Sequence, residues 1–403
     1  MNRRPRLFWV GDAVVQTGFA RVTHNVLDYL SQTWDVHVLG INYNGDPHSY
    51  KYHIYPAMLG GDVWGVGRAK RLVANLKPDV VLILNDAWCV TPYLAEIEDI
   101  VPCVAYIPVD AVNQMAGTRL NTLVRAITYT QFGRKQLMLG GYQGRCDVIP
   151  HGVDGRMYHP VPKATARKSV GLAEDAFIVG NVNRNQPRKR LDLTIQAWTQ
   201  WWVSAGQPRK ALLYLHASNN DIGINILQLC RYYGIEQQLV LTNPKMTTTH
   251  CLEEKNMKLV YNCFDVQINT GVGEGWGLTN HEGMACGVPQ IAVDTAGLAE
   301  WAAGAAMFVP VVSHQATMNG INTIAGVPSV DDLAKAIGVM YERPDIRASY
   351  ARKAYERAME PRFSWEVIAK QFDFALYDVV TEVRKSTEEA AKAEEAQRGQ
   401  VPA

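Results

Sequence analysis

Short apolar runs alternate with longer segments in which apolar residues recur every three or four positions, and this alternation occurs twice along the chain. In the first half, strands are predicted at 7–12, 36–41, 80–84, 101–108 and 127–130, and helices at 21–31, 67–76 and 115–124. In the second half, strands are predicted at 177–181, 211–216, 239–241, 266–269 and 290–293, and helices at 191–203, 225–233 and 280–286. Strands that alternate with helices are typical of parallel sheets, so the pattern predicts two α/β domains.

Proline and glycine interrupt both periodic patterns at 149–162, where we expect the interdomain linker. The first domain is expected to span 1–155 and the second 165–360. A last helix is predicted over 361–385, because apolar residues recur on one face from position 364 onward. Residues 386–403 are mostly Lys, Glu and Ala and are expected to form a solvated, frayed helix or a disordered tail.

Composition excludes several classes of protein. The 403 residues carry a formal net charge of +1, so no overall field attracts nucleic acid or an anionic membrane. No apolar run is long enough for a signal peptide or a spanning helix. Seven cysteines without a C-x-x-C pair argue against a disulfide framework or a zinc site, so we expect reduced thiols in a cytoplasmic protein.

The most informative segment is the glycine-rich stretch 273–289, which follows a predicted strand and opens a predicted helix. Glycine lets the backbone approach a ligand closely. The N–H groups of Gly277, Leu278 and Thr279 are expected to project from the start of this helix, where a diphosphate is favoured.

Two carboxylates flank this helix start, Glu274 before it and Glu282 within it. Both would repel a phosphate placed directly on them, whereas a carboxylate accepts paired hydrogen bonds from neighbouring hydroxyl groups. A ligand with a central diphosphate and a polyhydroxylated ring at each end is a nucleotide sugar.

At this segment the chain resembles the retaining GT-B glycosyltransferases of family 4, whose hallmark is an E-x7-E motif matched by Glu274 and Glu282. The resemblance implies two Rossmann-like domains facing each other across a cleft, with a C-terminal helix that crosses back to the first domain. It also implies that Glu274 contacts the donor sugar and Glu282 the ribose. The implied donor is a UDP- or GDP-sugar.

A second match lies in the stretch 181–192, between the first strand of the second domain and a helix. The family has an arginine and a lysine here that hold the donor diphosphate, and Arg184 and Lys189 match them. Such cations stabilise a departing nucleoside diphosphate. Because the run is dense in positive charge, Arg188 or Arg190 could replace Lys189.

In the first domain, Gly18 resembles the family's N-terminal glycine loop, near the diphosphate and the acceptor. Asp86 and Asp110 each follow a predicted buried strand, at the edge of the sheet where ligands bind in open α/β folds. Many relatives have a histidine at about the position of Asp110, and this chain departs from that pattern. Asp110 is therefore expected either to place the acceptor hydroxyl or donor sugar, or to cap a helix.

No metal site is expected, because the chain has no D-x-D motif to bridge a metal to a diphosphate. The sequence thus favours a metal-independent, retaining transfer of a hexose to a hydroxyl group of a glycan, a lipid-linked glycan or a small metabolite. Two alternatives stay open: a hydroxylated base of DNA as the acceptor, and an epimerase or hydrolase of GT-B shape acting on the nucleotide sugar. The acceptor, the sugar, the nucleotide and the oligomeric state are not decided by the sequence.

Overall fold

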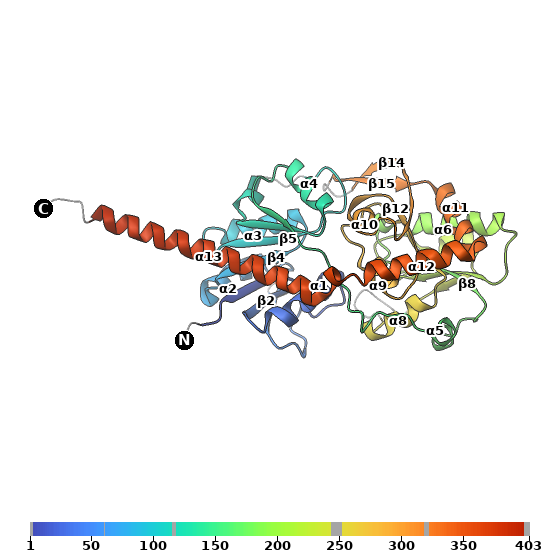
Figure 1. The fold of residues 1–403 in the computed structure, drawn as a ribbon, viewed down its shortest axis with the longest axis horizontal. Coiled ribbons are helices and arrows are strands. Elements are labelled where there is room, and N and C mark those ends of the chain that lie inside the picture. The colour runs from blue at the N-terminus through green and yellow to red at the C-terminus, as the bar shows by residue number, and fades with distance from the viewer. Residues whose placement is uncertain (1–2, 60, 115–117, 243–251, 318–321, 399–403) are drawn as a thin grey trace.

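The chain folds into two α/β domains in a computed structural model that describes residues 3–59, 61–114, 118–242, 252–317 and 322–398. Figure 1 shows the two domains side by side, with the last helix running back along the first domain. The two parallel-sheet domains expected from the sequence are therefore confirmed.

The first sheet has seven parallel strands in the order β3-β2-β1-β4-β5-β6-β7. Its central strands are buried on both faces because helices cover both sides of the sheet. In chain order, its elements are β1 (Arg6–Asp12), α1 (Gly18–Leu30), β2 (Asp35–Ile41), β3 (His53–Pro56), α2 (Val66–Leu76), β4 (Val80–Leu84), α3 (Ala87–Ile97), β5 (Cys103–Ile107), η1 (Thr118–Thr122), β6 (Arg125–Thr128), α4 (Gln131–Leu139) and β7 (Cys146–Val148).

The second sheet has six parallel strands in the order β10-β9-β8-β11-β12-β13. Its elements are α5 (Lys163–Val170), β8 (Phe177–Val182), η2 (Pro187–Lys189), α6 (Leu191–Ser204), β9 (Ala211–His216), α7 (Ile226–Tyr232), β10 (Leu239–Leu241), α8 (Glu254–Asn262), β11 (Val266–Asn269), α9 (Leu278–Ala285), β12 (Gln290–Val293), α10 (Ala296–Trp301) and β13 (Met307–Val309). An antiparallel hairpin of β14 (Val311–Ala316) and β15 (Ile324–Pro328) follows.

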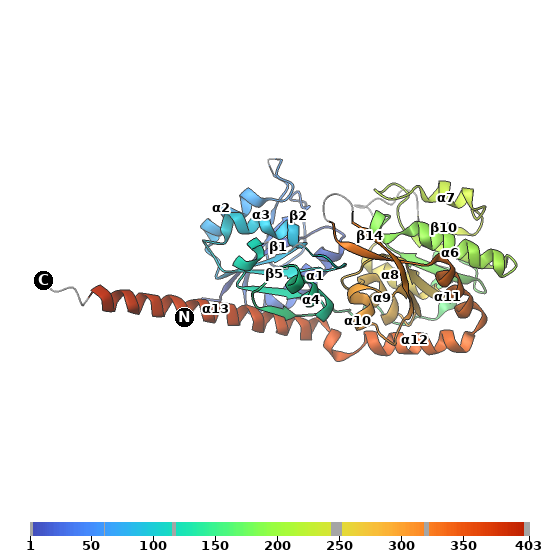
Figure 2. The ribbon, with the colours of Figure 1, turned by 90° about the horizontal axis from the view of Figure 1, so that it is seen from above.

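Three helical segments and a short 3-10 helix end the described chain: α11 (Val330–Glu342), α12 (Pro344–Ala358), η3 (Pro361–Phe363) and α13 (Trp365–Arg398). Pro344 begins α12 and Pro361 begins η3, as expected because proline fits the first turn of a helix and not its interior. Seen from above, α12 and α13 lie along one side of the molecule, and α2, α3 and α7 lie on the opposite side (Figure 2).

The crossover helix is confirmed, because α12 packs on α9 of the second domain whereas α13 packs on α1 of the first. The ring of Phe372 in α13 lies 6.2 Å from that of Trp9 in β1, centroid to centroid. The indole of Trp34 donates a 2.7 Å hydrogen bond to Asp373 of α13. The C-terminal helix thus joins the core of the first domain.

One predicted helix is wrong. The segment 115–124 contains only the short 3-10 helix η1, and its residues 115–117 lie outside the described part of the chain. The described segment buries Leu120 and Leu123, but it forms a single short 3-10 turn and gives only these two core contacts. At the other end, the charged tail continues α13 as far as Arg398, which agrees with the high helix propensity of Ala, Glu and Lys.

Candidate functional site

The carboxyl ends of the two sheets meet at the domain junction. Arg188, which follows β8 of the second sheet, places its guanidinium 3.6 Å from the carboxylate of Asp110, which follows β5 of the first sheet. Ligands of open α/β sheets bind at these ends of the strands, so the junction is the natural place for a site.

The start of α9 has the open geometry that the glycine-rich segment predicts. Gly277 adopts a left-handed conformation with φ of 82°, and a Cβ there would lie 2.9 Å from the side-chain oxygen of Asn280, so glycine is required. Among the residues that the structure describes, none accepts a hydrogen bond from the backbone N–H of Gly277, Leu278 or Thr279. These groups remain available to an anionic ligand.

A second helix start lies directly opposite. Gly18 begins α1, and a Cβ on it would be only 3.2 Å from the Leu278 side chain at the start of α9. Thr17 caps α1 by accepting a 3.1 Å hydrogen bond from the Ala20 N–H, and its hydroxyl donates to Asp12 at 2.6 Å. The loop predicted at Gly18 therefore lies against the start of α9, and two helix N-termini converge at the junction.

Glu274 and Lys189 form a buried ion pair at the carboxyl end of the second sheet. The side chain of Asn269, the last residue of β11, donates a further 3.3 Å hydrogen bond to Glu274. Burial alone would raise the pKa of Glu274, but the charges of Lys189 and Arg188 outweigh it and lower that pKa. Glu274 is therefore an ionised acceptor whose position is fixed by three side chains.

The other cations of the basic segment 184–190 point in different directions. Arg184 pairs with Asp221 at 3.0 Å and is half exposed, while Arg190 pairs with Asp192 at 2.8 Å. Arg188 donates a 3.1 Å hydrogen bond to the carbonyl of Gly273, and its Nη1 lies 3.8 Å from Glu274 Oε2. Arg188 is therefore the cation of the run that both reaches the glycine-rich loop and faces the first domain.

Glu282, in the middle of α9, is buried and contacts the first domain. Its Oε1 accepts a hydrogen bond from Arg21 of α1, and its Oε2 accepts a 2.6 Å hydrogen bond from the Tyr261 hydroxyl. Arg21 also pairs with Glu254 of α8 at 2.7 Å. Burial raises the pKa of Glu282, although the charge of Arg21 opposes this effect.

A pocket of about 800 Å³ lies between the domains and includes Arg21, Glu254 and Glu282 in its lining. Glu274 is not among the described residues that line it. The two glutamates of the E-x7-E motif thus occupy different parts of the junction.

Sequence reasoning did not single out Arg21 or Tyr261 as site residues. Arg21 lies on the first turn of α1, three residues after Gly18, so its proximity to the site could have been inferred from that loop. Tyr261 offers no such signal, because its position in α8 resembles that of an ordinary buried aromatic residue.

On the first domain, Asp86 and Asp110 lie where the sequence places them, after β4 and β5. Burial and the negative charge of Asp110 raise the pKa of Asp86 to about 6, although the positive charge of Arg188 opposes them. The hydroxyl of Tyr129, just past the end of β6, is buried, and burial together with the charges of Asp86 and Asp110 raises its pKa. The Asp86 side chain accepts no hydrogen bond from the N-terminus of α3. That leaves its carboxylate available to a ligand.

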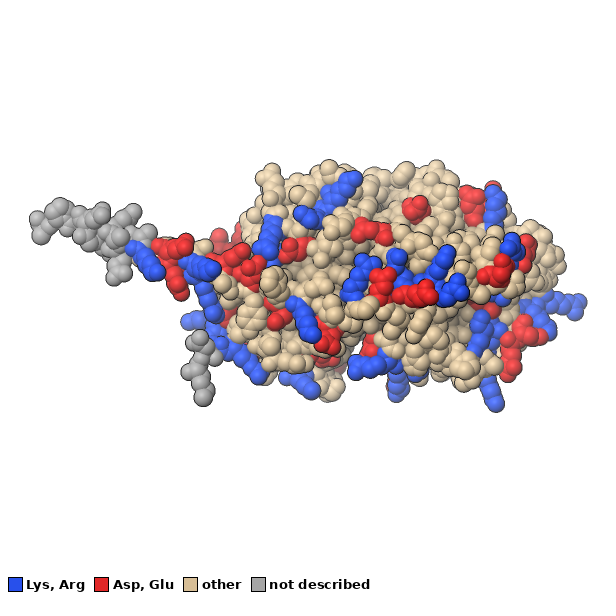
Figure 3. Space-filling model, in the orientation of Figure 1, with Lys and Arg blue, Asp and Glu red and all other residues tan. Residues whose placement is uncertain are grey.

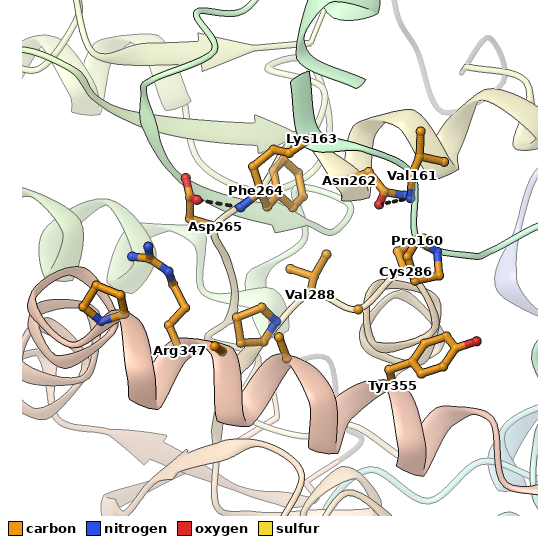
Figure 4. Close-up of a pocket in the computed structure, with 15 residues that line it drawn as sticks. Pro160, Val161, Lys163, Asn262, Phe264, Asp265, Cys286, Val288, Arg347 and Tyr355 are labelled. Carbon is orange, nitrogen blue, oxygen red and sulfur yellow. Dashed lines mark hydrogen bonds and ion pairs between the residues drawn. The ribbon is translucent and has the colours of Figure 1, made fainter. Parts of the chain in front are cut away.

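A separate cavity of about 500 Å³ lies at the opposite edge of the second sheet, where β11 and β12 begin (Figure 4). Its lining includes Phe264, Val288 and Tyr355, and its acidic residue Asp265 is paired with Lys163 at 2.6 Å. Amino ends of parallel strands are not where α/β sheets bind substrates. We therefore assign the site to the domain junction.

A family model described as "Glycosyl transferases group 1" matches residues 173–342, most of the second domain. This segment is similar to group 1 glycosyl transferase domains. Two proteins named D-inositol 3-phosphate glycosyltransferase are similar to the chain. The one from Gordonia bronchialis is 28% identical over 246 residues, which are 60% of this chain and 49% of that protein. The one from Kribbella flavida is 26% identical over 250 residues, 61% and 53% of the two proteins. The chain spans about half the length of these curated relatives.

Solved structures resemble both domains of the chain together. Sucrose-phosphate synthase from Thermosynechococcus elongatus superposes with a TM-score of 0.75 at 17% identity, over 94% of this chain and 100% of that one. Anabaena Alr3699/HepE in complex with UDP-glucose superposes with a TM-score of 0.70 at 16% identity, over 93% and 99%. The GT-B fold of the two domains is thus confirmed. Among the described residues, no helix combines the length and apolar character that crossing a membrane requires.

Proposed function

We propose that the protein is a glycosyltransferase that moves a hexose from a nucleoside diphosphate sugar, UDP-hexose in the first instance, to a hydroxyl group. The observation that carries this proposal is the convergence of two helix N-termini, at Gly18 and Leu278, beside Arg188 and Lys189. Free backbone N–H groups and cations in one place suit a diphosphate. The similarity to D-inositol 3-phosphate glycosyltransferases and to a fold crystallised with UDP-glucose supports the same donor class.

In this proposal the diphosphate lies between the glycine-rich loop and α1, where Gly18, Gly277, Leu278 and Thr279 present backbone atoms. Arg188 and Lys189 stabilise its charge, and Arg184 turns toward it from Asp221. Glu274 accepts hydrogen bonds from the hexose and Glu282 from the ribose. A carboxylate has about four lone-pair sites, so the two protein donors to Glu282 leave room for ribose hydroxyls.

The reaction breaks the bond between the anomeric carbon and the diphosphate oxygen, and the leaving nucleoside diphosphate takes the electron pair. The acceptor oxygen forms the new bond on the same face of the sugar, so the configuration is retained, and its proton passes to the departing phosphate oxygen. We propose that no metal takes part, since protein cations and helix starts offset the charge that develops on the leaving group. Domain closure keeps water from competing with the acceptor.

Thermal unfolding with nucleotides tests the donor assignment. UDP or UDP-glucose at 100 times its Kd should stabilise the full chain by about 2.7 kcal/mol. Arg188→Ala should weaken this effect strongly, whereas Lys335→Ala, an exposed residue that pairs with Asp332 on α11, should not. Absence of stabilisation by every nucleoside diphosphate tried would refute the proposal.

Product analysis separates transfer from hydrolysis and epimerisation. Incubation with UDP-glucose alone should release glucose slowly and form no epimer, and an acceptor hydroxyl should raise the rate of UDP release. The anomeric configuration of the product should be that of the donor, and the rate should persist in EDTA. Epimer formation, or hydrolysis as fast as transfer, would favour the alternative enzyme class.

A further inference from the structure

Three neighbouring strands of the first sheet each lead into an aspartate at the domain junction. Asp12 ends β1, Asp86 lies two residues past β4, and Asp110 lies three residues past β5. Asp12 is buried and accepts hydrogen bonds from Thr17 and Asn42. Asp86 and Asp110 interact through their charges, and Arg188 of the other domain lies 3.6 Å from Asp110. This edge of the first sheet is therefore acidic.

A buried hydroxyl without a partner lies next to these carboxylates. Tyr129 is 95% buried, its exposed fraction being 5%, and its hydroxyl makes no hydrogen bond within the described structure. The Tyr129 ring lies 3.5 Å, and the carbonyl of Val109, next to Asp110, lies 3.2 Å, from where a Cβ on Gly275 would stand. Burial first, and then the charges of Asp86 and Asp110, raise the pKa of this phenol. Buried polar groups are almost always satisfied. An orphan hydroxyl at a ligand-binding edge therefore points to a polar ligand.

Two exposed tryptophans border the same edge. Trp88 follows Asp86 by two residues at the start of α3 and is 52% exposed, and Trp64 just before α2 is 40% exposed. Their rings meet edge to face with centroids 6.0 Å apart. The Tyr93 hydroxyl donates a 2.6 Å hydrogen bond to the Trp64 carbonyl and holds that segment in place. Exposed aromatic rings at the edge of a polar site mark a surface for a ligand with apolar faces.

We propose that Asp86, Asp110, Tyr129 and the Trp64–Trp88 pair form the acceptor subsite, and that it takes an uncharged saccharide rather than a phosphate ester. This inference rests on the proposed function. A sugar ring presents C–H faces that stack on indole rings and hydroxyl groups that donate to carboxylates. Tyr129 supplies one more hydrogen-bond partner.

A phosphorylated acceptor fits this edge poorly. A phosphate group beside Asp86 and Asp110 would add like charges within a partly buried site, which disfavours binding. The cations at the junction are engaged by carboxylates of the protein, Arg188 with Asp110 and Glu274, and Lys189 with Glu274. In the proposed function they serve the donor diphosphate.

The same charges weigh against DNA as the acceptor. Binding to a phosphate backbone requires a basic surface. The face of the molecule in Figure 3 shows Lys and Arg interspersed with Asp and Glu rather than gathered in a stripe. Together with a net charge of +1, this favours a small neutral acceptor.

The test compares matched acceptors with the full chain and UDP-glucose. Methyl glucosides, maltose and sucrose are each set against glucose 6-phosphate and glucose 1-phosphate, and UDP release is measured as a function of acceptor concentration. At least one neutral saccharide should be used with kcat/KM ten or more times that of both phosphate esters. Better use of a phosphate ester, or no use of any neutral saccharide, would overturn the proposal.

Single substitutions test which residues of the subsite determine acceptor use. Trp88→Ala should raise the KM for the best neutral acceptor about tenfold or more and leave the thermal stabilisation by UDP unchanged. Asp110→Asn should lower the preference for neutral over phosphorylated acceptors. Tyr232→Ala, at an exposed aromatic of α7 in the second domain, serves as the control. It should change neither the acceptor KM nor the preference for neutral acceptors.

An unchanged acceptor KM in both Trp88→Ala and Trp64→Ala would exclude the aromatic surface. Thermal stabilisation by UDP is measured separately. If UDP does not stabilise the wild-type chain, the donor proposal is refuted and not the acceptor subsite.

Discussion

At the scale of single residues, the site depends on buried pairs of opposite charge. Glu274 and Lys189 are both buried, and each satisfies the other. Burial lowers the pKa of Lys189, and so does the neighbouring charge of Arg188, while Glu274 opposes both effects. A donor that hydrogen-bonds to Glu274 therefore meets a carboxylate already ionised and oriented, which limits the reorganisation that binding requires.

Removal of one member of this pair should be more harmful than removal of both charges. Lys189→Met leaves Glu274 buried with Arg188 as its remaining cation and Asn269 as a hydrogen-bond donor, and we expect the free energy of unfolding to fall by about 3–5 kcal/mol. The double variant Lys189→Met with Glu274→Gln should recover most of that loss without recovering activity. Urea unfolding measures the stability of both variants. Equal stability of the single and double variants would show that the ion pair is not coupled.

Asp86 should make stability depend on pH. Its pKa is raised to about 6, chiefly by burial and then by Asp110, so the folded state binds a proton more tightly than the unfolded state. The associated stability is present below about pH 4 and is lost as the pH rises through about 6. Asp86→Asn should therefore raise the free energy of unfolding above pH 7 by ~1–3 kcal/mol and change it little at pH 4.

Thermal unfolding at pH 4, 6 and 8 checks this expectation. Asp99→Asn, at an exposed position just beyond α3, is the matched control. A constant difference between wild type and Asp86→Asn across these values would contradict the assigned shift.

At the scale of helices and strands, the sequence predicts best where apolar periodicity is strong. The buried run of β4 and the helix that carries Trp198 and Trp201 were located closely, since packing and pattern agree there. Edge and outlying strands were missed, among them β3 and β14, because their exposed polar residues give no alternating pattern. Helix α3 was missed because its apolar residues are not confined to one face.

The site residues divide in the same way, into those that a local motif predicts and those that only a contact between the domains reveals. Glu274, Glu282 and Lys189 lie in two short motifs that resemble those of the family, and that resemblance implies that they face the space between the domains. Contacts across the junction could not, because the Arg21–Glu282 bond joins residues 261 positions apart. Such contacts depend on the relative placement of two domains, which no local pattern specifies. The roles in donor binding stay predictions.

The close approach of α1 and α9 gives a test at the level of elements. Gly18→Ala would place a Cβ 3.2 Å from Leu278, within the space between the two helix starts. Helix α1 itself should tolerate alanine, so the melting temperature should stay near that of wild type. We expect UDP to bind about tenfold more weakly, or ~1.4 kcal/mol, by calorimetric titration.

Leu278→Ala combined with Gly18→Ala should restore much of that affinity, since it removes the side chain that the new Cβ meets. Unchanged affinity in Gly18→Ala would show that the diphosphate does not lie between these helices.

At the scale of the whole molecule, two kinds of connection hold the domains together. Helix α13 is covalently continuous with the second domain and is packed into the first, where its Asp378 pairs with the buried Arg125 of β6. Across the junction itself, Glu300 of α10 accepts hydrogen bonds from the backbone N–H groups of Gln131 and Phe132 at the start of α4. The first connection ties the C-terminal helix to the first domain, and the second adds polar contacts across the junction beside the apolar contacts of Ala111 with Val272 and Ala325.

Arg21 is the polar contact best placed to couple closure to donor binding. It reaches from α1 to Glu282 and Glu254 on the second domain, next to the pocket between the domains. Arg21→Met keeps the apolar stem but removes both ion pairs. We expect the free protein to open, with a larger radius of gyration by small-angle scattering, and the KM for UDP-glucose to rise about tenfold.

The control for this experiment is Arg119→Met, which removes an ion pair with Glu98 inside the first domain. It should leave both the radius of gyration and the KM unchanged. If UDP-glucose restores the compact form of Arg21→Met at saturation, ligand contacts alone suffice to close the junction and Arg21 sets only the resting equilibrium. If Arg21→Met is as compact and as active as wild type, Arg21 plays no part in closure, and the hydrogen bonds from Gln131 and Phe132 to Glu300 become the contacts to test.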